Sequence, residues 1–293
     1  MTNDDPGRIS SGHPWPHAPG REVLERLGVR PSKALGQNFL HDPKIVRRIA
    51  DEADPAPTDL VVEVGPGLGI LTAELARRAE RVVAVELDHR LAEYLRDAFS
   101  DPPVHVVGAD ILTVDLHLLT SGRPYTVVAN LPYSVAAAAI ERLLEADRPP
   151  IALVVMVQRE VAKRIVARPP DMSVLAVAVQ FHGRPRIVFR LGPGAFFPPP
   201  KVDSAVLRID VNPEPRLTGE RRLAFFRLVR AGFSQRRKRL ANAIAASLDS
   251  PKPDVEQRLR AVGIDPDRRA ETLTVEDWLA VERGLGALTR AAH

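Results

Sequence analysis

Short apolar runs alternate with segments of helical periodicity along the first two thirds of the chain. Five runs are apolar enough to be buried strands; they span residues 61–64, 82–85, 104–107, 127–129 and 151–157. Two of the segments between them, residues 71–79 and 91–99, carry apolar side chains at the three- and four-residue spacing of a helix. This alternation predicts an α/β domain with a parallel, doubly wound sheet.

The pattern changes after residue 170. Residues 173–181 form an apolar run that suits either a buried strand or a buried helix, and Ser173 as a possible N-cap favours the helix. Residues 187–191 and 206–211 read as a closing pair of strands on either side of a proline-rich loop, residues 192–201.

A proline-rich break, Asn-Pro-Glu-Pro at residues 212–215, predicts a domain boundary. We expect a cofactor-binding domain over residues 21–211 and a helical domain over residues 217–293, preceded by a disordered leader at residues 1–20. In the helical part, two apolar stripes predict the buried faces; they consist of Leu223, Phe226, Val229 and Phe233, and of Leu240, Ile244 and Leu248.

The composition of the 293 residues excludes several classes of protein. No apolar run reaches the ~18 residues of a membrane span, and the start of the chain carries no apolar secretory segment, so we expect a cytoplasmic protein without a membrane partner. The absence of cysteine excludes disulfides, thiolate catalysis and iron–sulfur clusters. The eight histidines lack ligand spacing, so we expect no metal site. We expect the protein to act as a monomer.

Positive charge is concentrated near the carboxyl end of the sequence. The net charge is +4, yet the chain from Arg221 onward holds 15 Lys and Arg residues against nine Asp and Glu residues. Four basic residues are consecutive: Arg236, Arg237, Lys238 and Arg239. This cluster predicts contacts with a polyanion such as RNA, although four neighbours cannot share one helix face and some of them are then only solvated.

A glycine loop joins the first strand to the following helix. Its glycines are Gly65, Gly67 and Gly69, the first, third and fifth positions of the loop. Nicotinamide and flavin enzymes usually place glycine at the first, third and sixth positions to seat a pyrophosphate, whereas Ile70 occupies the sixth position here. The loop therefore suits a nucleoside ligand without a pyrophosphate, such as S-adenosylmethionine. Taken alone, the loop is equally compatible with an ordinary turn.

Two carboxylates follow the next two strands. Glu86 ends the second strand, where a carboxylate can accept both ribose hydroxyl hydrogens. Asp110 follows the third strand and can accept from the adenine amino group. Each alone is compatible with a surface charge or a turn residue, but both together favour the cofactor site.

Asn130-Leu131-Pro132-Tyr133 follows the fourth strand, at the same predicted sheet edge. The exocyclic nitrogen of adenine is a poor nucleophile because its lone pair is delocalised into the ring. Acceptors at its two hydrogens, the Asn130 side-chain oxygen and the Leu131 carbonyl, can free that lone pair to attack a methyl group. Tyr133 offers a face on which the base can stack. The alternative interpretation is a simple β-turn.

A second aromatic face is expected on the proline-rich loop. Extruding a base costs a few kcal/mol, and each base–aromatic contact returns about 1–3 kcal/mol, so two faces would balance the cost. Phe196 is the candidate. Its alternative role is packing beneath the loop.

Several segments together resemble the ribosomal RNA adenine N6-dimethyltransferase family. They cover residues 21–283 and comprise Leu35-Gly-Gln-Asn-Phe-Leu40, Val62-Glu-Val-Gly-Pro-Gly-Leu-Gly69, Val85-Glu-Leu-Asp88, Asn130-Leu-Pro-Tyr133, Phe197-Pro-Pro-Pro-Lys-Val-Asp-Ser-Ala-Val206, Gln235-Arg-Arg-Lys238, Gly263-Ile-Asp-Pro266 and Arg269-Ala-Glu271. The resemblance implies a Rossmann-like class I methyltransferase fold with a seven-stranded, mostly parallel sheet. It also implies S-adenosylmethionine-dependent dimethylation of two adjacent adenosines in the 3′-terminal hairpin of 16S rRNA during small-subunit assembly. By position it places Asn38, Leu40, Gly65, Glu86, Asp110 and Asn130 at the cofactor.

The chain departs from the family pattern after Tyr133. Ser134 and the alanines at residues 136–139 stand where the family commonly has Asn and bulkier residues. We expect that this departure can change the volume of the pocket. The volume affects whether one or two methyl groups are transferred to the same nitrogen. The stretch before Leu175 also lacks a common Tyr-Gly pair, and the leader has no counterpart.

Three other functions compete with this one. The first is a related methyltransferase acting on large-subunit RNA, which residues 263–266 and 201–206 disfavour. The second is a nucleic-acid-binding assembly factor that lost catalysis, which the intact residues 65–69 and 130–133 disfavour. The third is a nicotinamide dehydrogenase, which Ile70 disfavours.

Overall fold

The computed structural model describes residues 23–289, apart from residues 26, 33–34, 57 and 236. The expected leader at residues 1–20 lies outside the described residues. None of the helices in this described part is both long enough and apolar enough to cross a membrane.

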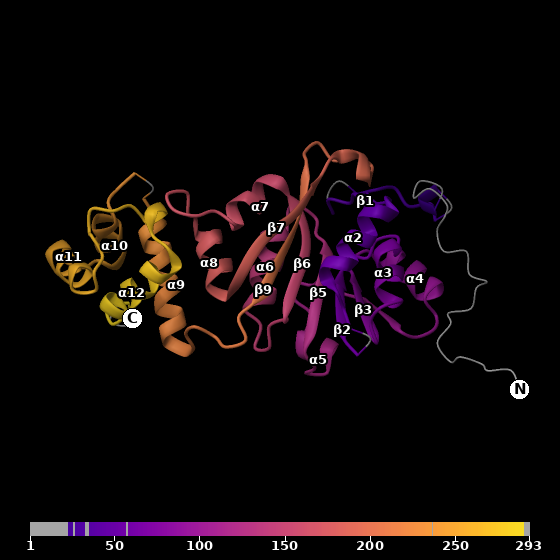
Figure 1. The fold of residues 1–293 in the computed structure, drawn as a ribbon, viewed down its shortest axis with the longest axis horizontal. Helices are drawn as coiled ribbons and strands as arrows, with labels where there is room; N and C mark the ends of the chain where they lie inside the picture. The colour runs from indigo at the N-terminus through magenta and orange to yellow at the C-terminus, as the bar shows by residue number, and fades with distance from the viewer. Residues whose placement is uncertain (1–22, 26, 33–34, 57, 236, 290–293) are drawn as a thin grey trace, which may run out of the picture.

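A seven-stranded sheet forms the centre of the larger part of the molecule, with strand order β4-β3-β2-β5-β6-β9-β7 (Figure 1). The five parallel strands are β4 (Val104–Gly108), β3 (Arg81–Glu86), β2 (Leu60–Val64), β5 (Tyr125–Asn130) and β6 (Ala152–Gln158). Strand β9 (Ser204–Val211) runs antiparallel to both β6 and the edge strand β7 (Gly183–Leu191). The predicted α/β fold, the mostly parallel sheet and the closing pair of strands are confirmed.

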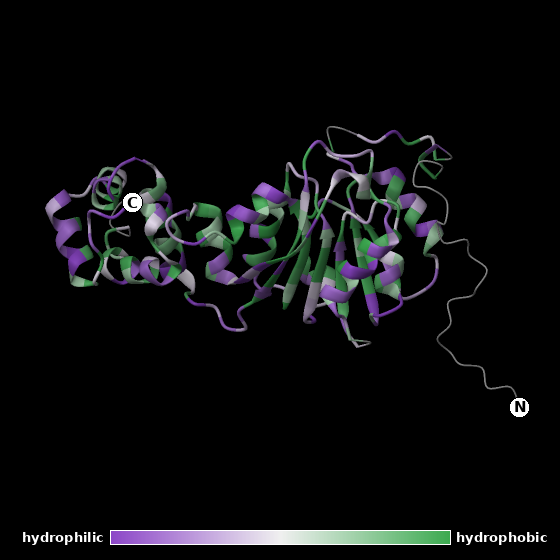
Figure 2. Ribbon diagram, turned by 45° about the horizontal axis from the view of Figure 1, so that its top comes forward, coloured by the Kyte–Doolittle hydropathy of each residue, from purple (hydrophilic) through white to green (hydrophobic). Residues whose placement is uncertain are grey.

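Helices cover both faces of the sheet. On one face, α2 (Pro43–Ala53), α3 (Ile70–Ala76) and α4 (His89–Ala98) pack on strand residues such as Val61 and Ala84. On the other, α6 (Ala136–Leu144), α7 (Arg159–Ile165) and α8 (Val174–His182) pack on residues such as Val62. The hydropathy of the ribbon follows this layering, because the strands in the middle are largely hydrophobic (Figure 2). Helix α5 (Leu116–Thr120) lies in the connection to β5.

The ambiguous segment after residue 172 is the helix α8, as predicted. The Ser173 hydroxyl accepts a hydrogen bond from the Ala176 nitrogen at 3.2 Å, which satisfies one of the free donors at the start of the helix. The run is almost entirely apolar because α8 is buried on two sides: Leu175 faces the sheet, whereas Ala176 and Phe181 face the helices that follow.

The last part of the chain is helical, as predicted. It contains α9 (Gly219–Phe233), α10 (Leu240–Leu248), α11 (Lys252–Ala261), the short η2 (Ala270–Thr272) and α12 (Val275–Leu285). Their core surrounds the fully buried Trp278 and Phe225 and also includes one side of α8. Because α8 shares this core, the two parts are packed together, and the boundary at residues 212–216 stays a prediction.

The predicted apolar stripe of α9 is wrong in one position. Leu223 is 54% exposed, whereas Phe225 and Leu228 are fully buried. The reason is tertiary, since α8, α10 and α12 all pack against α9 and together select a broader face than a single stripe.

Candidate active site

The glycine loop between β2 and α3 lies at the carboxyl ends of the parallel strands, where an open α/β sheet binds its ligand. Gly65 and Gly67 have positive φ angles of 70° and 58°, which side chains disfavour. A Cβ on Gly67 would lie 2.9 Å from Cδ1 of Phe39, closer than real contacts allow. The loop therefore requires glycine here, because an aromatic ring from the start of the domain packs directly on its backbone.

Residues 35–40 run across the same edge of the sheet. The two-residue strand β1 (Phe39–Leu40) pairs antiparallel with β8 (Phe196–Phe197), which follows the turn η1 (Pro193–Ala195). The Gln37 amide nitrogen donates to the Asp88 carboxylate at 3.0 Å, so the segment is also fastened to the end of β3. Without the family resemblance, the sequence predicts no function for this segment, because its position depends on partners far away in the chain.

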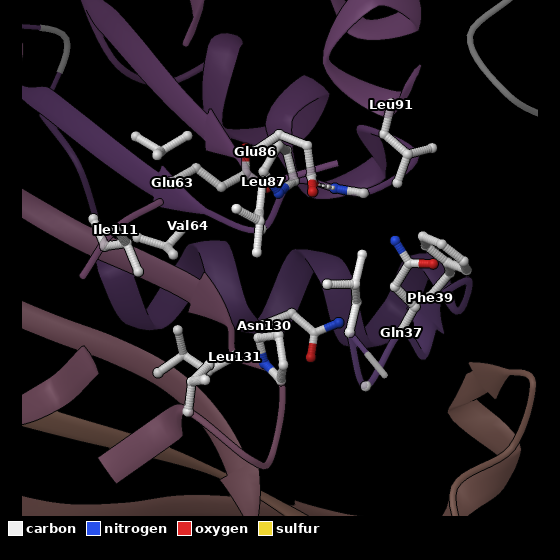
Figure 3. A pocket seen from close by; sticks show the side chains of 18 of the residues that line it. Gln37, Phe39, Glu63, Val64, Glu86, Leu87, Leu91, Ile111, Asn130 and Leu131 are labelled. Carbon is white, nitrogen blue, oxygen red and sulfur yellow. Dashed lines mark hydrogen bonds between the residues drawn. The ribbon is translucent and has the colours of Figure 1, made fainter. Parts of the chain in front are cut away.

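The predicted cofactor residues line one pocket. They are Asn38, Leu40, Gly65, Gly67, Glu86, Asp110 and Asn130, and the acceptor residues Leu131 and Tyr133 line it as well. Figure 3 shows Asn130 across the open centre of this pocket from Glu63 and Glu86. The structure thus brings together residues that are separated by up to 95 positions in the sequence.

Glu86 is 6% exposed and accepts two backbone hydrogen bonds. Its Oε2 atom accepts from the Gly67 nitrogen and its Oε1 from the Asp88 nitrogen, both at 3.0 Å. Burial raises the pKa of Glu86 above its ordinary value, and the two backbone donors oppose that rise. Each carboxylate oxygen keeps a second lone pair, so the group can still accept from ribose hydroxyls.

Asp110 follows β4 and also contributes to local structure. One of its carboxylate oxygens, Oδ1, accepts from the Leu112 nitrogen at 2.9 Å, as a turn residue would. The side chain nevertheless lines the pocket, so the turn and the pocket functions are compatible.

The Asn130 amide is held in a fixed orientation. Its Nδ2 atom donates to the carbonyl oxygen of Asn38 at 3.1 Å. Because the nitrogen is used in this way, the side-chain oxygen is the atom left to accept a hydrogen bond. Its role toward the amino group of an adenine stays a prediction. The next residue, Leu131, is held against β6, because its backbone nitrogen donates to the carbonyl oxygen of Met156 at 3.3 Å.

Tyr133 is positioned by a residue that the sequence did not reveal. Its hydroxyl lies 2.6 Å from the hydroxyl of Ser204, a fully buried residue at the start of β9. Burial raises the pKa of Tyr133, and the hydrogen bond with Ser204 partly opposes this. A serine inside a strand 71 positions away carries no sequence signal for this pairing.

The prediction for Phe196 is wrong in this structure. The residue is 3% exposed, belongs to the core beneath α2 and does not line the pocket. Its strand β8 pairs with β1, and this pairing directs the ring inward next to Leu40. The aromatic residues that line the pocket are Phe39 and Tyr133, and Tyr133 is the one that follows the fourth parallel strand beside Asn130.

The family departures after Tyr133 do not reach the pocket. Val135 lines it, but Ser134 and residues 136–139 do not. Ala136 and Ala139 are fully buried in α6 and pack in the core on one face of the sheet. These side chains are therefore not part of the pocket lining, and the expected change in pocket volume stays a prediction.

Glu63 is the pocket residue that sequence reasoning missed. It is 1% exposed, lines the pocket and lies in the otherwise apolar strand β2. Burial raises its pKa to about 8, and the neighbouring Glu86 adds to the rise. A carboxylate inside a buried apolar run was the available signal, because a glutamate is rarely fully buried unless it has a partner.

The basic cluster lies on the connection between α9 and α10 rather than on a helix. Arg237, Lys238 and Arg239 are exposed, and Arg239 pairs with Asp267 at 2.7 Å. Arg236 lies outside the described residues. This connection and the carboxyl ends of the parallel strands both lie toward the top of Figure 1.

Within the residues described, no three His, Cys, Asp or Glu side chains are grouped so that they could hold a metal ion.

Residues 29–285 match the model of a family described as ribosomal RNA adenine dimethylase. A relative named ribosomal RNA small subunit methyltransferase A, from Dehalococcoides mccartyi (strain CBDB1), is 44% identical over 280 residues, covering 95% of this chain and 96% of its own length. A relative of the same name from Geobacillus kaustophilus (strain HTA426) is 42% identical over 283 residues, covering 92% of this chain and 97% of its own length.

Two solved structures share the fold. The 23S rRNA methyltransferase ErmE is 31% identical with a TM-score of 0.69, covering 85% of this chain and 99% of its own. A dimethyladenosine transferase from Plasmodium falciparum is 23% identical with a TM-score of 0.75, covering 85% of this chain and 98% of its own, and supports the fold alone. The family match, the identities and the pocket agree, and this chain is a member of the ribosomal RNA adenine dimethylase family.

Proposed function

We propose that the protein uses S-adenosylmethionine to dimethylate the N6 atoms of two adjacent adenosines in the 3′-terminal hairpin of 16S rRNA, during small-subunit biogenesis. The observation that carries the proposal is the single pocket formed by Gly65, Glu86 and Asn130 at three neighbouring strand ends. The relatives named ribosomal RNA small subunit methyltransferase A support the substrate. A ribosomal substrate also accounts for the exposed basic connection and for an expected cytoplasmic site of action.

The residues present suit S-adenosylmethionine. A loop that must be glycine allows a ligand to approach the backbone, and Glu86 and Asp110 offer acceptors for a ribose and an adenine. Asn38 and Leu40 also line this pocket. When bound, this cofactor supplies an electrophilic methyl group.

The chain's own residues then position the acceptor. The Asn130 oxygen and the Leu131 carbonyl accept the two hydrogens of the adenine amino group, which localises the nitrogen lone pair. Tyr133 stacks on the base, and its hydroxyl stays fixed by Ser204. Catalysis is then mainly positioning, and no strong general base is required because the nitrogen becomes acidic once methylated. All these groups come from one chain, so a monomer suffices.

RNA binding is assigned to the α9–α10 connection. Arg237 and Lys238 are exposed and carry no ion pair among the described residues, so they remain free to contact phosphates. The helical part then holds the RNA backbone while the larger domain receives the base.

The test is incubation of the protein with labelled S-adenosylmethionine and undermethylated small subunits, followed by mapping of the modified bases. We expect label on two adjacent adenosines of the 3′-terminal hairpin, and much slower labelling with the Asn130→Ala variant. The 31% identity with a 23S rRNA methyltransferase makes large-subunit RNA the second candidate. Label on large-subunit RNA and none on the hairpin would replace the first substrate by the second.

A further inference from the structure

Glu63 differs from the other carboxylates of the pocket in its hydrogen bonding. Both oxygens of Glu86 accept a backbone N–H, and Asp110 accepts one as well. In contrast, no described residue donates a hydrogen bond to the buried Oε2 atom of Glu63. The nearby Thr72 hydroxyl of α3 also lacks a partner: it is close enough to lower the pKa of Glu63, but outside hydrogen-bond geometry.

A buried, unsatisfied carboxylate costs several kcal/mol if it is ionised, and it avoids this cost by holding a proton. The charged group that faces Glu63 is Glu86 on β3, which disfavours ionisation. Thr72 of α3 is polar but uncharged, and the strand neighbours Ala84 and Val128 are apolar. Among the described residues, none thus offers Glu63 a cation, and its pKa is about 8.

The order of the strands indicates which end of the cofactor reaches Glu63. The proposed function assigns the nucleoside to Glu86 and Asp110, at the ends of β3 and β4, and the reacting methyl group to Asn130, at the end of β5. Strand β2 lies between β3 and β5. The end of β2, with Glu63 two residues before Gly65, is therefore left for the amino-acid end of the cofactor, which carries an ammonium cation.

We propose that Glu63 is a proton-linked acid of the cofactor site, neutral in the free protein and ionised once the ammonium group of the cofactor lies beside it. The proton leaves the carboxyl group for the solvent when the cofactor binds. The cation then supplies the partner that the Oε2 atom lacks. This inference rests on the proposed use of S-adenosylmethionine.

The linkage between proton release and cofactor binding determines how the cofactor affinity changes with pH. A carboxyl group with a pKa near 8 is almost fully protonated at about pH 6.5, and an α-amino group with a pKa of about 7.7–8.0 is still a cation there. Binding should release close to one proton, and the affinity should rise about tenfold per pH unit between about pH 6 and 7.

The experiment is titration calorimetry of the full chain in two buffers of different protonation enthalpy, which counts the protons released on binding. The ligands are S-adenosylmethionine, S-adenosylhomocysteine and 5′-methylthioadenosine, which lacks the amino-acid end. We expect about one proton with the first two and none with the third. Glu63→Gln, which keeps the shape of the neutral acid, should bind without proton release. The control Glu74→Gln removes an ion-paired glutamate of α3 that does not line the pocket, and it should release the proton as the wild type does.

Several outcomes would overturn the inference. Undiminished proton release in Glu63→Gln would assign the proton to another group, Glu86 first. Release with 5′-methylthioadenosine would exclude the ammonium as the partner, and release with S-adenosylmethionine but not S-adenosylhomocysteine would point to the sulfonium. Should Glu63→Gln not fold, the three ligands with the wild type decide alone. Failure of the wild type to bind S-adenosylmethionine at all would instead refute the proposed function.

Discussion

Gly67→Ala tests whether the contact between the glycine loop and Phe39 shapes the cofactor pocket. The substitution adds one methyl group at a position with a φ of 58°. That methyl group would lie 2.9 Å from Cδ1 and 3.2 Å from Cε1 of the Phe39 ring. The ring is 6% exposed and packs with Leu68 and Leu91, so it cannot simply turn into solvent.

Two costs add at this position. A non-glycine residue in the left-handed region costs about 1–2 kcal/mol. Overpacking a buried contact costs about 1–3 kcal/mol more, unless the ring moves. Movement of Phe39 displaces its neighbours Asn38 and Leu40, which line the pocket. Either way, we expect cofactor affinity to fall at least about tenfold, equivalent to about 1.4 kcal/mol.

Gly263→Ala is the matched control. Gly263 has a φ of 79°, but a Cβ there meets no atom within 4 Å, and the residue lies far along the chain in the helical part. This variant should lose about 1–2 kcal/mol of unfolding free energy and keep the cofactor affinity of the wild type.

The measurements are urea unfolding for stability and calorimetric titration with S-adenosylhomocysteine for affinity. Gly67→Ala should lose more stability than Gly263→Ala and should alone lose affinity. Equal stability losses in the two variants, with unchanged affinity in both, would refute the idea that Phe39 and the loop are tightly packed.

Three further predictions concern turnover and RNA binding. Asn130→Ala should lower single-turnover methylation about 10²–10³-fold, the usual loss for one positioned hydrogen-bonding group, while RNA affinity in filter binding changes little; an unchanged rate would exclude the positioning mechanism. Ser204→Ala removes the hydroxyl that fixes Tyr133 and should lower kcat with cofactor affinity unchanged; reduced cofactor binding with normal kcat would contradict this role. Replacing Arg237 and Lys238 together by Ala should weaken RNA binding and reduce the salt slope by about 0.7–0.9 per lost phosphate contact; an unaltered slope would show that both side chains are only solvated.

The sequence by itself determined the layered fold and most of the pocket. Apolar runs alternating with helical segments require a parallel sheet, and such a sheet gathers the residues that follow its strands at one edge. Glu86, Asp110 and Asn130 were therefore predictable as neighbours, since each stands at or just after the end of a strand. The glycine loop was predictable for the same reason.

The tertiary structure decided what depends on partners distant in the chain. Phe196 turned inward because β8 pairs with β1, and Leu223 became exposed because three other helices select the buried face of α9. Ser204 became the partner of Tyr133 because β9 runs antiparallel to β6, which places the first residue of β9 at the carboxyl end of β6. Local periodicity cannot encode such contacts, because they form only when the whole sheet is assembled. The same holds for Glu63: the sequence places a carboxylate in an apolar strand, but only the packed structure leaves one of its oxygens without a partner.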